Sequence, residues 1–293
     1  MTVFGSGYRA LDYQPTSMLR RLWALAVLDV RAPFRTKFGT ILFLLCQLPG
    51  YAALVLLLIW SGFWQLGNAR NQAMHATGAM SPTEVDFYLS CATSQQAFLT
   101  ITTLVTFTVA RAIAKDRASQ AIEILWTRGI TPIGYFAGRV LGAVCLLGLG
   151  IVVMPALLWV FAWINAVDGT FLSSTIAFLP RLFAALLFHT VAVAFLATAI
   201  SCLPRTANVA SILWAMLLVG GRSLGTMVTH FASDPVYRAL GPWDDIRRVT
   251  EAIAGVQPAV EFPLGDAVVG CIVLAVAAVV VVFRRLRMVE AIG

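Results

Sequence analysis

Charged residues are scarce in this sequence: Asp, Glu, Lys and Arg together make up only 12% of its 293 residues. Soluble domains usually carry about a quarter charged residues, so this composition excludes an ordinary soluble globule. Hydrophobic residues make up 59% of the chain, and its mean hydropathy is +0.84. We therefore expect one membrane domain with no soluble domain attached.

Residues that carry chemistry are also few. The chain has two lysines, Lys37 and Lys115, and neither lies in the G-x-x-x-x-G-K-[ST] loop that binds nucleotide phosphates. Its three histidines are scattered, and no G-x-S-x-G or H-E-x-x-H motif is present. The five cysteines stand singly, which argues against a disulfide framework or a metal site. We predict no catalytic residue, metal or cofactor in this chain, and hence no enzyme.

Long apolar runs dominate the sequence instead. A helix needs roughly 20 mostly apolar residues to cross the hydrocarbon core of a bilayer. Six segments reach or approach that length: residues 38–62, 91–114, 133–164, 179–203, 207–228 and 266–283. The sequence thus predicts an all-α membrane protein with six transmembrane helices, in a domain spanning residues 38–283.

The basic residues set the orientation of these segments, because cytoplasmic loops carry an excess of Lys and Arg. Fifteen of the 21 basic residues lie on one side when six spans are threaded with the N-terminus inside. We therefore place residues 1–37 and the tail 284–293 in the cytoplasm, and the long loops 63–90 and 229–265 outside. Basic residues that flank apolar runs in this way also argue against a nucleic-acid partner.

Two short helices are predicted outside the spans. Residues 17–32 should form an amphipathic helix, with Ser17 as its N-cap and Pro33 at its end. Its apolar stripe comprises Leu19, Leu22, Trp23, Ala26, Val27 and Val30. A basic helix with such a face suits the inner surface of the membrane. In the second outer loop, residues 243–253 are expected to form a surface helix.

The connection between the second and third spans carries the most specific pattern. Residues 115–128 form a charged helix in this prediction, with Asp116 near its start and Arg128 at its end, as the helix dipole favours. Ile122, Leu125 and Trp126 lie on one side of it. Such a helix, held between two spans, could transmit motion from a soluble partner into the membrane. A plain charged loop is the alternative.

This connection resembles the coupling-helix region of ABC-2 type transporter permeases, the membrane subunits of type V ABC exporters. The matching elements are Asp116-Arg117, Ser119, Ile122-Glu123, Leu125, residues 127–131 and Gly138-Arg139. Gln120-Ala121 and Gly129 depart from the family pattern, which often has Gly-Thr and Pro there. The wider layout also agrees: an interfacial N-terminal helix, six spans and a helical outer loop before the last span.

The resemblance implies an exporter subunit in a bacterial cytoplasmic membrane. Such permeases dimerise with a second copy or a paralogue, and two cytoplasmic ABC ATP-binding subunits, which hold ATP and Mg, dock on the coupling helices. It implies that the ATPase contacts here include Asp116, Arg117, Glu123, Trp126 and Arg128. This chain itself would need no cofactor.

Within the spans, small and ionisable residues are the remaining candidates. Gly134, Gly138 and Gly142 form a small-x-x-x-small ladder that suits close helix packing, although the glycines could also be incidental. His189 and Arg222 could line a cavity, since ionisable groups are costly at membrane depth. A single internal hydrogen bond is the alternative for His189. Arg139 and Arg181 lie near span ends, where we expect them to extend toward lipid headgroups.

Two other functions stay open. A secondary transporter would need ion or substrate ligands buried in its spans, and acidic residues are nearly absent from the apolar runs. An integral membrane enzyme or scaffold would need a cluster on one membrane face, and no motif for one is present. The identity of a transported substrate leaves no recognisable pattern in the sequence.

Overall fold

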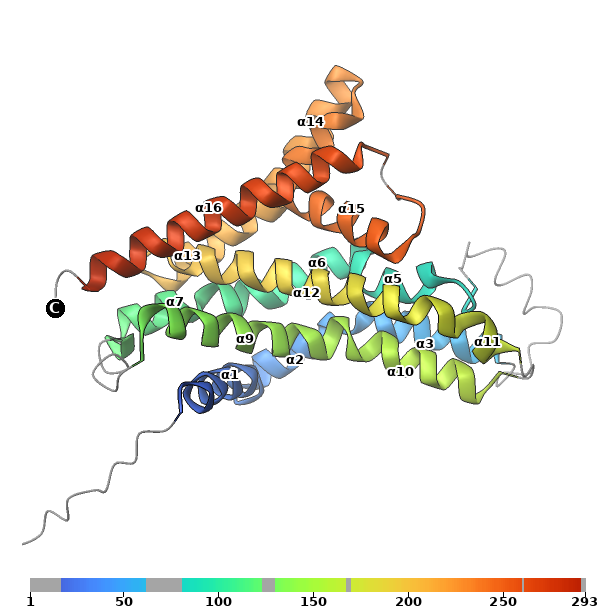
Figure 1. Ribbon diagram of the computed structural model, residues 1–293, viewed down its shortest axis with the longest axis horizontal. Helices are drawn as coiled ribbons and strands as arrows, with labels where there is room; N and C mark the ends of the chain where they lie inside the picture. Colours follow the sequence, from blue (N-terminus) through green and yellow to red (C-terminus); the bar gives the residue numbers. More distant parts are fainter. Residues whose placement is uncertain (1–16, 62–80, 123–129, 167–169, 260, 291–293) are drawn as a thin grey trace, which may run out of the picture.

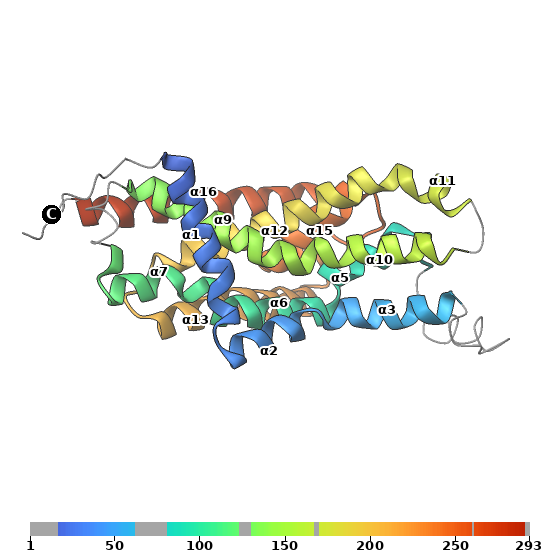
Figure 2. The ribbon, with the colours of Figure 1, turned by 90° about the horizontal axis from the view of Figure 1, so that it is seen from below.

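The protein is predominantly helical over the residues that the computed structural model describes, which are 17–61, 81–122, 130–166, 170–259 and 261–290. Five helices in these ranges are long and apolar enough to cross a membrane, and a sixth span results if a bent helix pair counts as one. Most lie lengthwise side by side in an elongated bundle (Figures 1 and 2). These features are those of an all-α, multi-pass membrane protein.

The helices follow the predicted runs, but most runs are divided. The elements are α1 (Met18–Phe34), α2 (Lys37–Cys46), α3 (Leu48–Trp60), α5 (Val85–Thr93), α6 (Gln95–Phe107), α7 (Val109–Ala118), α9 (Pro132–Ile151), α10 (Val153–Ile164), α11 (Phe171–Thr175), the 3₁₀ turn η1 (Ile176–Phe178), α12 (Leu179–Ser201), α13 (Ala207–Ala215), the π-helical turn η2 (Met216–Gly220), α14 (Gly221–Ala232), the 3₁₀ helix η3 (Pro235–Leu240), α15 (Pro242–Ala254) and α16 (Leu264–Glu290).

The first predicted span is the bent pair α2–α3, whose axes differ by 48°. Gln47 stands between the two helices, and Pro49 occupies the first turn of α3. A proline is well suited to the start of a helix, where its missing N–H has no partner to lose. The proline therefore begins a new helix inside one apolar run.

A separate buried helix precedes the second span, which comprises Gln95–Ala118. We expected residues 63–90 to form an outer loop, but residues 85–93 form helix α5, which is packed into the core. Tyr88 is fully buried there, and its hydroxyl donates a hydrogen bond to the Pro82 carbonyl (2.8 Å). Ser94 then caps α6, and Thr108 separates α6 from α7. Part of the predicted loop is therefore helical and buried, which the polar residues at the start of α5 did not indicate.

Helix α1 lies across the bundle near the end where α7 terminates (Figure 2). Its N-cap is Ser17, as predicted, and it extends one residue beyond Pro33. The predicted apolar stripe does not act as one surface: Leu19 and Trp23 are 78% and 58% exposed, whereas Leu25 and Ala26 are buried. Helix α1 therefore packs inward through a neighbouring face and leaves part of the predicted stripe open to the surroundings.

The predicted surface helix in the second outer loop is not on the surface. Helix α15 lies between α12 and α16 (Figure 1), and eight of its 13 residues are buried, charged ones included. Gly255, with φ of 76°, ends it in the left-handed conformation that glycine adopts most readily. One of these charged residues, Asp244, pairs with Arg222 of α14, a contact that the sequence pattern does not reveal.

Candidate functional site

Helix α1 packs against α9 through the predicted glycine ladder. All three glycines, Gly134, Gly138 and Gly142, face side chains of α1. A Cβ atom would lie 3.2 Å from Leu25 Cβ if it were placed at Gly138, and 2.7 Å from Asp29 Cβ at Gly142. Small residues let two helix backbones approach this closely. The ladder therefore serves the contact of the crossing helix with the bundle.

Arg139, next to Gly138 within this ladder, joins three helices. Its guanidinium forms ion pairs with Asp29 of α1 and Asp116 of α7, and its Nε donates to the Tyr135 hydroxyl (3.2 Å). The Tyr135 hydroxyl in turn donates to Asp116 Oδ2. The three ion-paired side chains are only 12–18% exposed. Arg139, which we expected to extend toward lipid headgroups, is thus held inside the protein by two carboxylates.

The electrostatics of this junction differ from the sequence-based picture. Asp116 lies in the last turn of α7, where the negative end of the helix dipole disfavours a carboxylate, and Arg139 supplies the compensating charge. Burial raises the pKa of Asp29 to about 6, although the charge and hydrogen bond of Arg139 oppose that rise. Asp29 was not predicted as a site residue. Its only mark in the sequence is that it is the single acidic residue in a helix of basic and apolar residues.

Helix α7 is also fixed to the end of α12. Arg117 Nη1 donates to the carbonyl oxygens of Cys202 (3.0 Å) and Pro204 (3.4 Å), which lie beyond the last turn of α12. The buried Ser201 hydroxyl accepts hydrogen bonds from the backbone N–H groups of Ile113 (3.0 Å) and Ala114. A displacement of α7 therefore has to move the end of α12 as well.

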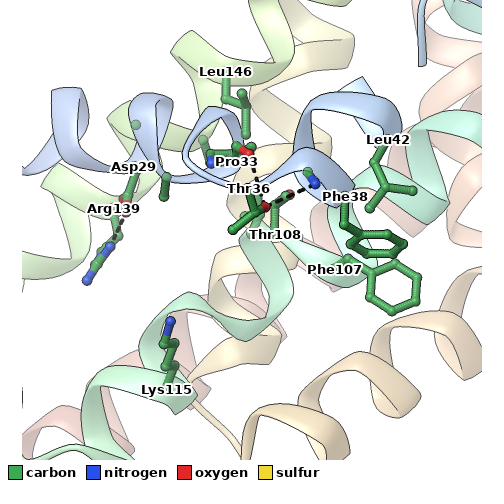
Figure 3. Close-up of a pocket in the computed structure, with 15 residues that line it drawn as sticks. Asp29, Pro33, Thr36, Phe38, Leu42, Phe107, Thr108, Lys115, Arg139 and Leu146 are labelled. Atoms are coloured by element: carbon green, nitrogen blue, oxygen red, sulfur yellow. Dashed lines mark hydrogen bonds and ion pairs between the residues drawn. The ribbon is translucent and has the colours of Figure 1, made fainter. Parts of the chain in front are cut away.

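A cavity of about 230 Å³ adjoins the junction, between the α1–α2 corner and helices α6, α7 and α9. Asp29 and Arg139 lie at one end of it, and Phe38 and Phe107 at the other (Figure 3). Lys115 extends into this space from α7. The α1–α2 corner thus keeps free volume beside the ion pairs, and small shifts of α1 need not overcome close packing there.

The predicted coupling segment is only partly within the described residues. Helix α7 continues from the second span to Ala118, and a turn follows in which Gln120 has a φ of 58°. Asp116 and Arg117 therefore end a span rather than begin a separate helix, and both side chains are engaged within the chain. Ile122 is buried and belongs to the same hydrophobic cluster as Tyr135. Glu123, Leu125, Trp126 and Arg128 lie outside the described residues.

The two ionisable candidates for a cavity lining are both engaged by α15 instead. His189 is fully buried on α12, with Nδ1 3.2 Å from the Thr250 hydroxyl and its ring edge-on to Trp243. Arg222 of α14 forms an ion pair with Asp244 (3.4 Å) and lies over the Phe98 ring. Neither residue lines the cavity at the α1–α2 corner. The π-helical turn η2 ends two residues before Arg222.

No protein-family model matches the chain, and no curated protein matches it in a sequence search. The geometry of the junction is therefore the basis for a functional assignment.

Proposed function

We propose that this chain is the permease subunit of an ATP-driven ABC-2 type exporter in a bacterial cytoplasmic membrane. In this proposal α2–α3 counts as one of six spans, and both termini are cytoplasmic. Two permease chains, identical or paralogous, form the translocation path. Separate ATP-binding subunits hold ATP and Mg and dock on residues 115–128.

The observation that carries the proposal is the Arg139 junction. It joins the crossing helix α1 to α7 and α9, and its Asp116 lies at the start of the segment that we expect to contact the ATPase. Hydrogen bonds from Arg117 and to Ser201 extend the connection to α12. Bonds between ionised groups are about twice as strong as neutral ones. A force applied beyond Ile122 would thus move several helices together, which is what coupling to ATP hydrolysis requires.

Affinity purification of the tagged chain in mild detergent, with mass spectrometry of the associated proteins, tests this proposal. We expect a soluble ATP-binding subunit to co-purify, and Glu123→Lys with Arg128→Glu to abolish its recovery. Arg205→Glu is the matched control, because Arg205 is exposed on another predicted cytoplasmic connection. Recovery of the permease alone from wild-type cells, or of the ATPase with the charge-reversed chain, would contradict the docking assignment.

A second candidate, a proton-driven secondary transporter, is favoured by one specific observation. The near absence of acidic residues from the apolar runs spoke against this candidate. In the structure, however, Asp244 and Asp245 are buried between helices. The two candidates differ in their energy source. Uptake into proteoliposomes that contain the permease alone, driven by a proton gradient, would support the secondary transporter. A requirement for the co-purified subunit and ATP would support the exporter.

A further inference from the structure

The first turn of α15 holds two buried carboxylates beside a single paired cation. Asp244 and Asp245 are each 1% exposed. Arg222 forms an ion pair with Asp244, whereas Arg247 is paired with Glu251 on its own helix (2.7 Å). Among the described residues no ion pair is formed by Asp245. The charges of Arg238 and Arg247 also act on Asp244, but within the described ranges no cation is paired with an ionised Asp245.

Asp245 is directed at the backbone of α16. A Cβ atom added at Gly270 would collide with the Asp245 carboxyl group, so the two helices meet where α16 has no side chain. Asp245 Oδ1 is buried and has no hydrogen-bond partner among the described residues. The carboxyl group is therefore enclosed between two helices without a donor to stabilise its charge on that oxygen.

The charged and titratable neighbours do not supply the missing cation. Asp244 on the same helix and Asp266 on α16 both repel a charge on Asp245, and the neighbouring thiol of Cys271 carries no positive charge. From α14, Arg222 is paired with Asp244, and in η3 Arg238 donates to Thr226. On α12, His189 is hydrogen-bonded to Thr250 through Nδ1, and its Nε2 has no hydrogen-bond partner among the described residues.

An ionised carboxylate that is buried without a cation costs several kcal/mol, and such groups bind a proton instead. We propose that Asp244 and Asp245 form a proton-binding site: Asp244 stays ionised beside Arg222, and Asp245 carries the proton that lets α15 lie against Gly270. Loss of this proton places an unpaired charge between α15 and α16 and weakens their contact. The site binds a proton in the isolated chain, so the proposal does not depend on the transporter assignment.

The direction of the pKa shift of Asp245 agrees with this geometry. Burial, reinforced by the charges of Asp244 and Asp266, raises the pKa of Asp245 to about 8. An acid with a raised pKa in the folded state binds more protons folded than unfolded between about pH 4 and that value, so stability falls as the pH rises through this window. An Asn in place of Asp245 keeps the shape of the neutral acid and removes the dependence.

Infrared spectroscopy of the purified full-length chain tests the site. We expect wild-type protein at neutral pH to show the carbonyl stretching band of a protonated carboxyl group, which shifts on ¹³C-aspartate labelling and disappears as the pH is raised through about 8. Asp245→Asn should remove the band. Asp234→Asn, which changes an exposed residue of the same loop, should leave it. Gly270→Ala should lower the pH at which the band is lost, because it displaces the carboxyl group from its enclosure.

Two results would overturn the proposal. One is the absence of any aspartate-sensitive carboxyl band in wild-type protein at neutral pH, a measurement that needs no variant to fold. The other is a band that persists unchanged in folded Asp245→Asn protein. Either outcome would leave the exporter proposal untouched, because that proposal is tested by the recovery of an ATP-binding subunit.

Discussion

Gly142 offers the most direct test of the contact between α1 and α9. A Cβ atom at this residue would lie 2.7 Å from Asp29 Cβ and 3.1 Å from the backbone Cα of Ala26. The Asp29 side chain can rotate away, but the α1 backbone cannot yield without a shift of the whole helix. Alanine at this residue should therefore push α1 away from α9 and disturb the Arg139 ion pairs.

The expected magnitude follows from a comparison within the same helix. Forcing an extra methyl group into a packed contact costs about 1–3 kcal/mol. Gly148, also on α9, has no atom within 4 Å of a Cβ added there, so Gly148→Ala adds a methyl group without a clash. Both substitutions gain the same helix propensity, up to about 1 kcal/mol. The difference between the two variants should therefore be about 1–3 kcal/mol, with Gly142→Ala the less stable.

The assay is unfolding by increasing SDS in mild detergent micelles, followed by circular dichroism. Gly138→Ala should fall between the other two variants, because the atoms near its Cβ belong to the flexible side chains of Leu25 and Leu22. Equal stability of Gly142→Ala and Gly148→Ala would refute the reasoning. It would mean that α1 does not pack on the glycine ladder, and the Asp29–Arg139 ion pair would have to be abandoned with it.

Three further predictions concern the junction. Arg139→Gln should lower the free energy of unfolding by about 3 kcal/mol, because it leaves the carboxylates of Asp29 and Asp116 without a cation. Unfolding in SDS measures this loss. A change below about 1 kcal/mol would contradict the prediction. The raised pKa of Asp29 means that the folded chain binds more protons than the unfolded chain between about pH 4 and about 6, so stability should fall as the pH rises through that window. Asp29→Asn should flatten this part of a melting-temperature profile, and an unchanged slope would be evidence against the burial of Asp29. Ser201→Ala should lower the free energy of unfolding by about 1 kcal/mol in the same SDS assay, because it removes the hydroxyl that accepts a hydrogen bond from the Ile113 N–H. An unchanged free energy of unfolding would show that this hydrogen bond does not link α7 to α12.

Much of the helical architecture could be predicted from the sequence. A chain in lipid must satisfy its backbone hydrogen bonds internally, so an apolar run of sufficient length has almost no alternative to a helix. Breaks within the runs were less predictable. Pro49 is compatible with the interior of an apolar run and with the start of a new helix, and only packing around Gln47 decides between them. The break at Thr108 could not be predicted because no Pro or Gly marks it, and threonine is common inside membrane helices.

The positions of charged residues were the hardest to predict, and the reason is physical. Burial of a single charged side chain costs free energy, so a prediction from sequence places each charged residue in water. This reasoning applies to Asp29, Asp116, Arg139 and the acids of α15. Burial becomes favourable only when a partner from a distant segment shares the cost, and Arg139 does this for two carboxylates that lie 110 and 23 residues away. Asp245 has no such partner in the described part of the chain, so it is buried as the neutral, protonated acid. A charged residue that sits between apolar helices without a counter-charge is therefore a stronger indication of function than one whose ion pair explains its place.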